Sequence, residues 1–101
     1  MLNMEMGDLQ LLQGLLAVHV PHKTVWAYGS RVTGTSHAGS DLDLVVIDPA
    51  GKQTNLISLR TAVNHSLLPI SVDILDWALI PASFRESIQK AYVVIQEGGV
   101  Q

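Results

Sequence analysis

The stretch Leu42–Ile47 constrains the fold of this chain more than any other feature. It is almost continuously apolar and stops at Asp48 and Pro49. A strand of this kind is covered on both faces, whereas a strand with one face in water alternates apolar and polar residues. We therefore expect a central strand with other elements packed on each side of it.

Further strands and helices alternate along the chain. β-branched and aromatic residues predict strands over residues 24–28 and 70–75, and apolar residues at helical spacing predict helices over residues 4–18 and 53–66. Pro81, followed by Ser83 and Glu86, predicts a last helix that ends near Lys90. Residues 93–95 fit an edge strand or the end of that helix, and residues 98–101 a frayed tail. This order predicts an α/β or α+β sheet domain.

Length and charge limit what the domain can do. The 101 residues, of which 48% are apolar, allow one hydrophobic core and no second domain, so a single domain over residues 1–101 is expected. The net charge is −3, with six Lys and Arg residues scattered along the chain. A phosphate backbone is neutralised by a clustered basic face, so extensive nucleic-acid binding is not expected.

Hydropathy and cysteine content indicate the cellular location of the protein and the metal ligands that it can offer. No segment approaches ~20 uninterrupted apolar residues, and residues 1–8 lack the positive flank of a secretion signal, so a soluble, cytoplasmic protein is expected. The absence of cysteine excludes disulfides, thiolate nucleophiles and thiolate metal sites. A bound metal would therefore have oxygen or imidazole ligands, which favours hard cations.

Two carboxylates lie at the start of the central strand. Asp41 and Asp43 are separated by one residue, so on a strand both side chains project from one face, about 7 Å apart. Two ionised carboxylates side by side repel each other, and a divalent cation removes that conflict. The pair favours Mg²⁺, which binds one or two carboxylates together with water and substrate phosphates.

A glycine and a hydroxyl follow the preceding strand. Gly29 allows a ligand to approach the backbone closely, and Ser30 adds a hydroxyl donor, so the pair suits phosphate oxygens. Arg31 either makes a bidentate contact to a phosphate or forms a surface ion pair. One edge of the site would bind a triphosphate and the other the metal, as nucleotidyl transfer requires.

A third carboxylate completes a two-metal site, and Asp73 is the candidate. It interrupts an apolar strand without a packing reason, and carboxylates in mid-strand are disfavoured. Asp48 and Asp76 are nearby alternatives, but Asp76 ends the strand, where a helix cap is the simpler interpretation. Asp73 would also be placed to take the proton from an attacking hydroxyl.

Together these residues resemble a known signature. Gly29-Ser30, ten intervening residues, Asp41-Leu42-Asp43, and Asp73 within Ser71-Val-Asp-Ile-Leu are similar to the motif of the DNA polymerase beta nucleotidyltransferase superfamily. The short length and the runs Tyr28-Gly-Ser-Arg-Val-Thr-Gly-Thr and Ser40-Asp-Leu-Asp-Leu-Val-Val resemble its minimal nucleotidyltransferase (MNT) branch. The similarity covers about residues 24–95. It implies a nucleotidyltransferase fold, that is, a mixed β-sheet of three to four strands with helices on one side.

The resemblance also implies an activity and a partner. MNT proteins use Mg²⁺ and ATP, and many are antitoxins that transfer AMP to a tyrosine of a helical HEPN toxin. By carry-over, Gly29 and Ser30 would hold the triphosphate, Asp41 and Asp43 both metal ions, and Asp73 one metal ion and the attacking hydroxyl.

Two other functions stay open at this point. One is a non-catalytic antitoxin that neutralises a HEPN partner by contact alone, and the other is a transferase that acts on a small molecule or an RNA end. Larger relatives build their acceptor pockets from an additional helical domain, for which 101 residues leave no room. A homodimer or hetero-oligomer would supply the missing wall.

Overall fold

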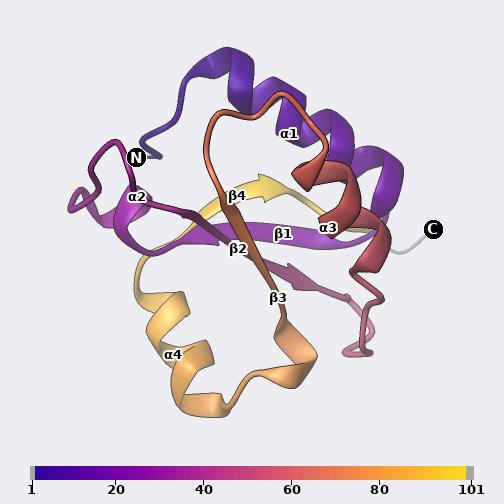
Figure 1. Ribbon diagram of the computed structural model, residues 1–101. Coiled ribbons are helices and arrows are strands. Elements are labelled where there is room, and N and C mark those ends of the chain that lie inside the picture. The colour runs from indigo at the N-terminus through magenta and orange to yellow at the C-terminus, as the bar shows by residue number, and fades with distance from the viewer. Residues whose placement is uncertain (1, 100–101) are drawn as a thin grey trace.

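The computed structural model describes residues 2–99, which form a mixed four-stranded sheet with helices on both faces (Figure 1). Along the chain the elements are α1 (Met6–His19), β1 (Thr24–Tyr28), α2 (Ser30–Thr33), β2 (Leu42–Ile47), α3 (Ile57–Asn64), β3 (Val72–Asp76), the 3₁₀ turn η1 (Trp77–Leu79), α4 (Ala82–Lys90) and β4 (Val93–Gln96). The strand order is β3-β2-β1-β4. β1 is antiparallel to β2 and β4, whereas β2 and β3 are parallel. The predicted mixed sheet is confirmed.

The central strand β2 is covered on both faces, as its apolar sequence predicts. Leu42, Leu44 and Val46 pack into the larger core with residues of α1 and α3. Val45 points the other way and packs with Tyr28 of β1 and Ile88 of α4. The expectation of helices on one side, which came from the family resemblance, is therefore wrong. α4 covers the face opposite α1 because a strand that is apolar on both faces needs cover on both (Figure 1).

The larger core is built mainly from aliphatic side chains. Leu12 and Leu16 of α1, Leu59 of α3 and Val25 of β1 are completely buried in it. Each such side chain contributes about 2 kcal/mol when it leaves water. This core fixes β1 and β2 in place, and these strands carry part of the candidate site.

Several elements begin or end at other residues than predicted. The helix expected over residues 4–18 is Met6–His19, and the strand expected over residues 70–75 is Val72–Asp76. The helix expected over residues 53–66 is shorter in the structure, Ile57–Asn64. Its expected first turn is not helical because the backbone N–H of Thr54 donates to Asp76 at 2.8 Å and that of Ile57 to the side chain of Asn55 at 3.0 Å. Residues 93–95, for which the sequence left a strand or a helix end open, belong to the edge strand β4.

The expected frayed tail is only partly described. Gly98 is held in place, since its N–H donates to the hydroxyl of Thr24 at 3.0 Å. Val100 and Gln101 lie outside the described residues. Within residues 2–99, each helix is too short or too polar to cross a lipid bilayer.

Candidate active site

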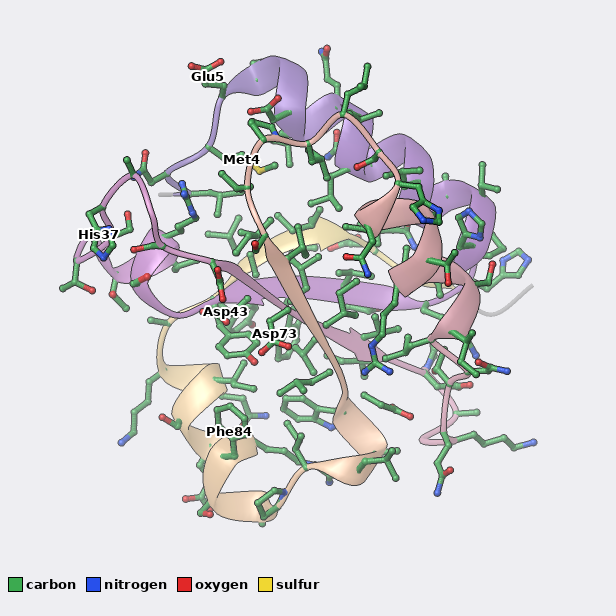
Figure 2. The ribbon with its side chains drawn as sticks, viewed as in Figure 1. Met4, Glu5, His37, Asp43, Asp73 and Phe84 are labelled. Atoms are coloured by element: carbon green, nitrogen blue, oxygen red, sulfur yellow. The ribbon has the colours of Figure 1, made fainter. Side chains whose placement is uncertain are left out.

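Three strands bring a tyrosine and two carboxylates into one row across the sheet. Asp43 of β2 is the register partner of Tyr28 on β1 and of Asp73 on β3. Neighbouring strands lie about 4.8 Å apart and paired side chains share a face, so the two carboxylates are close neighbours. Figure 2 shows Asp43 and Asp73 on the side of the sheet that faces α4, the helix that carries Phe84.

The surroundings of Asp43 disfavour the ionised form of its carboxyl group. Burial raises the pKa of its carboxyl group, and the negative charges of Asp73 and then Asp41 raise that pKa further. The same surroundings act on Tyr28, where burial, followed by the charges of Asp43 and Asp73, raises the pKa to about 12. The tyrosine therefore stays protonated at neutral pH and lies beside the carboxylates of Asp43 and Asp73.

Asp41 stands at the open end of the row. It precedes β2, is exposed, and joins the carboxylate cluster from the loop side. Pairing with the neighbouring strand β3 begins one residue later, where the N–H of Leu42 donates to the carbonyl of Ser71 at 2.9 Å. The position of Asp41 consequently depends on the loop before it as well as on the sheet.

Gly29 makes room for this cluster. Its φ of 81° lies in the region that favours glycine, and it turns the chain from β1 directly into α2. A Cβ atom at this position would overlap a carboxylate oxygen of Asp43. The glycine therefore lets the backbone beside Ser30 lie directly against the carboxylates.

The chemistry of the cluster fits Mg²⁺. Burial, followed by the charges of Asp73 and Asp41, raises the pKa of Asp43, and a divalent cation would relieve the repulsion among the three carboxylates. Within residues 2–99, no three acidic or histidine side chains are gathered tightly enough to enclose a metal ion alone. Mg²⁺ does not require such a cage, because it keeps several waters and takes further oxygens from substrate phosphates.

The side chain of Arg31 contacts backbone carbonyls in the structure, whereas the sequence suggested a phosphate or an ion-pair partner. Its side chain is only 7% exposed. Nε and Nη2 donate to the carbonyl of Ser40 at 3.0 and 2.9 Å, and Nη1 donates to the carbonyl of Asn3 at 3.0 Å. The guanidinium is thus committed to backbone carbonyls rather than to solvent or to an acidic partner.

The alternatives to Asp73 have other roles in the structure. Asp48 forms an ion pair with Lys23, with 2.5 Å between Nζ and Oδ2. Asp76 is 5% exposed and accepts hydrogen bonds from the N–H groups of Ala78, at 3.1 Å, and Thr54, at 2.8 Å. The helix-cap interpretation of Asp76 is confirmed, and of these three carboxylates only Asp73 is paired with Asp43.

The structure adds residues that the sequence did not single out. Tyr28 lies beside the carboxylate cluster because it is the register partner of Asp43, and this register cannot be deduced from the strand pattern alone. A cavity of about 270 Å³ adjoins the site between α2 and α4. Its walls are formed by Tyr28, Gly29, Thr33, Phe84, Ser87, Ile88 and Ala91. Phe84 meets the ring of Tyr28 edge to face, with 5.8 Å between the ring centroids.

Fold and site together define a nucleotidyltransferase. Residues 12–98 match the family described as Polymerase beta, Nucleotidyltransferase, and the chain belongs to this family. It is 42% identical over 99 residues to a protein of Haemophilus influenzae described as "Probable protein adenylyltransferase MntA". That alignment covers 95% of this chain and 85% of the relative. The resemblance to the MNT branch is thus confirmed.

Solved structures share the fold. A crystal structure described as a toxin–antitoxin with AMP-PNP matches with a TM-score of 0.72 at 20% identity, covering 88% of this chain and 73% of that one. A mutant form of the toxin–antitoxin MntA-HpeT matches with a TM-score of 0.71 at 18% identity and the same coverage. At these identities the likeness establishes the nucleotidyltransferase fold.

Proposed function

We propose that this chain is a Mg²⁺-dependent protein adenylyltransferase that transfers AMP from ATP to a hydroxyl group of a partner protein. The acceptor is a tyrosine of a HEPN toxin, and the transfer makes this chain an antitoxin. The observation that carries the proposal is the pairing of Asp43 with Asp73 across parallel strands, beside Gly29 and within the field of Asp41. The relative described as an adenylyltransferase and the toxin–antitoxin fold match support it.

Each site residue has a role in this reaction. Asp41, Asp43 and Asp73 would hold two Mg²⁺ ions, which supply positive charge for the phosphates. Gly29 and Ser30 would hold the triphosphate. The acceptor oxygen forms a bond to the α-phosphorus of ATP, the bond from that phosphorus to the β-phosphate oxygen breaks, and pyrophosphate leaves. Asp73 accepts the proton of the acceptor hydroxyl.

A labelling experiment tests the proposal. The purified chain is incubated with ATP labelled on its α-phosphate, Mg²⁺ and the helical protein encoded beside it. We expect label on the partner, loss of label with EDTA, and a mass increase of one AMP on a tyrosine. Absence of label with wild-type protein and Mg²⁺ would contradict the proposal.

Carboxylate variants separate catalysis from binding. Asp41→Asn combined with Asp43→Asn should abolish both labelling and neutralisation of the partner. Asp48→Asn is the matched control, since Asp48 directly follows β2 but is paired with Lys23. If the double variant neutralised the partner as well as wild type, the chain would act by contact alone and the catalytic proposal would be wrong.

A further inference from the structure

The loop that leads into Asp41 is tied to the rest of the fold at a few defined points. Within the loop, His37 and Ser40 bond each other twice, N–H to hydroxyl and N–H to carbonyl, both at 2.9 Å. Arg31 reaches in from α2 and binds the carbonyl of Ser40 with two nitrogens. The side chain of Asn3 donates to the hydroxyl of Ser36 at 2.8 Å.

Arg31 also forms hydrogen bonds to Asn3, in the segment of residues 2–5 before α1. The N–H of Asn3 donates to the carbonyl of Arg31 at 2.7 Å, and Nη1 of Arg31 donates back to the carbonyl of Asn3 at 3.0 Å. Elsewhere this segment and the loop stand apart, because Met4, Glu5 and His37 line a cavity of about 370 Å³ to which Arg31 also contributes (Figure 2). Arg31 therefore links α2 with the loop and with the segment before α1, in addition to the direct hydrogen bond from Asn3 to Ser36.

Burial of an arginine side chain costs the folded state free energy. Its charge loses water, and here its three mapped hydrogen bonds go to neutral carbonyls rather than to a carboxylate. An apolar side chain could occupy the same volume at lower cost, but it could not hold two carbonyl oxygens in fixed directions. The planar guanidinium thus fixes the direction of the Ser40 carbonyl, and Ser40 is the residue before Asp41.

We propose that Arg31 is a positioning residue, which fixes the carboxylate of Asp41 by holding the Ser40 carbonyl and by fastening residues 2–5 to the loop. The inference rests on the proposed function for its kinetic readout. It assigns Arg31 a role that acts through Asp41 and not through direct contact with ATP. Catalytic groups must be held within about 0.5 Å of their working geometry, so a loosened Ser40 carbonyl should affect the rate.

The kinetic test compares Arg31→Lys with Arg85→Lys. Arg85 is a matched control, because its Nε also donates to a backbone carbonyl, that of Trp77, at 3.0 Å, far from the Asp41 loop. We expect Arg31→Lys to lower kcat by about tenfold or more and to raise the Mg²⁺ concentration that gives half the maximal rate. The KM for ATP should stay within about twofold, because Lys keeps the charge and the phosphate cradle is untouched. Arg85→Lys should change none of these.

A raised KM for ATP with unchanged kcat would overturn the proposal, since that pattern belongs to a direct phosphate ligand. Unchanged kcat and unchanged Mg²⁺ dependence would overturn it as well.

Hydrogen exchange provides a readout that does not depend on activity. In Arg31→Lys the amides of His37 and Ser40 should exchange faster, while those of the central strand keep their wild-type rates. Should Arg31→Lys fail to fold, Asn3→Ala removes only the exposed link to Ser36 and should accelerate the same amides to a smaller extent. Unchanged exchange in the folded variant excludes the proposed link, even if wild type transfers no AMP and the proposed function is wrong.

Discussion

Gly29 has a positive φ and lies directly against Asp43 of the candidate site. Gly29→Ala should lower the free energy of unfolding by about 1–2 kcal/mol, because an L-residue at a φ of 81° is strained. It should also lower kcat by about tenfold or more, because the new methyl group overlaps the carboxylate of Asp43 and must displace it. Chemical denaturation and AMP-transfer kinetics measure the two effects.

Gly34→Ala is the control that separates them. Gly34 has a similar φ of 88°, but an added Cβ there meets no atom within 4 Å. This variant should lose less stability than Gly29→Ala, because Gly34 has a ψ of 10° in the left-handed helical region whereas Gly29 has a ψ of −158° in a region almost exclusive to glycine. Its kcat should stay within about twofold of wild type. Equal losses of kcat in both variants would mean that strain in the turn, rather than contact with Asp43, limits the reaction.

Asp48 provides a pH-dependent test. The hydrogen bond from Lys23, followed by that from the N–H of Ala50, holds the pKa of Asp48 below its ordinary value of 3.8. A lowered folded-state pKa stabilises the fold above the ordinary value, and that stability is lost as the pH falls through the folded-state pKa. Asp48→Asn should therefore be less stable than wild type at pH 7, and the difference should shrink below pH 3.8. Urea denaturation across this range measures it.

At the scale of single residues, the sequence indicated candidate residues better than it indicated side-chain orientation. Asp43 and Asp73 stood out because carboxylates in apolar strands have no packing role, and the register places them together. The contacts of Arg31 could not be predicted, because spacing does not reveal that its guanidinium turns back onto the carbonyls of Ser40 and Asn3. The position of Tyr28 beside Asp43 could not be predicted either, because it depends on register, which is a tertiary property.

Among the elements, η1 depends on one buried carboxylate. Asp76→Ala leaves the N–H groups of Ala78 and Thr54 without their partner and should cost about 2–4 kcal/mol of unfolding free energy. Asp76→Asn keeps one acceptor oxygen and should lose about half as much. Thermal and chemical unfolding rank the two variants. If Asp76→Ala were as stable as wild type, water would be satisfying both N–H groups and the cap would have no structural importance.

The ends of β1 and β2 were predicted accurately, and those of α3 were not, for a physical reason. β1 and β2 begin and end at the predicted residues because β-branched and apolar runs are bounded by Gly29 and Asp48. α3 was overestimated because its lead-in is held by Asp76, which is distant in sequence. The apolar sequence of β2 correctly predicted cover on both faces, whereas the family resemblance did not. Local pattern determined the sheet, while long-range contacts determined the helix ends.

On the scale of the whole molecule, the carboxylate cluster opposes folding in the absence of a cation. A raised pKa at Asp43 means that its ionised form costs the folded state stability at neutral pH. The fold tolerates this cost because the two cores on either side of the sheet hold β1, β2 and β3 in register. Cation binding would recover part of that stability, because a ligand of the native state shifts the folding equilibrium.

Asp43→Asn should consequently raise the free energy of unfolding of the metal-free protein at pH 7 while it abolishes AMP transfer. Mg²⁺ should stabilise wild type more than the variant, because one of its ligands is lost. Asp48→Asn changes the same residue type at the other end of β2 but removes an attraction, so its stability should shift in the opposite direction. Chemical denaturation with EDTA and with Mg²⁺ compares all three proteins. If both variants lost stability without metal, Asp43 would be held by attractive contacts, and repulsion among the three carboxylates would give no reason for this site to bind a cation.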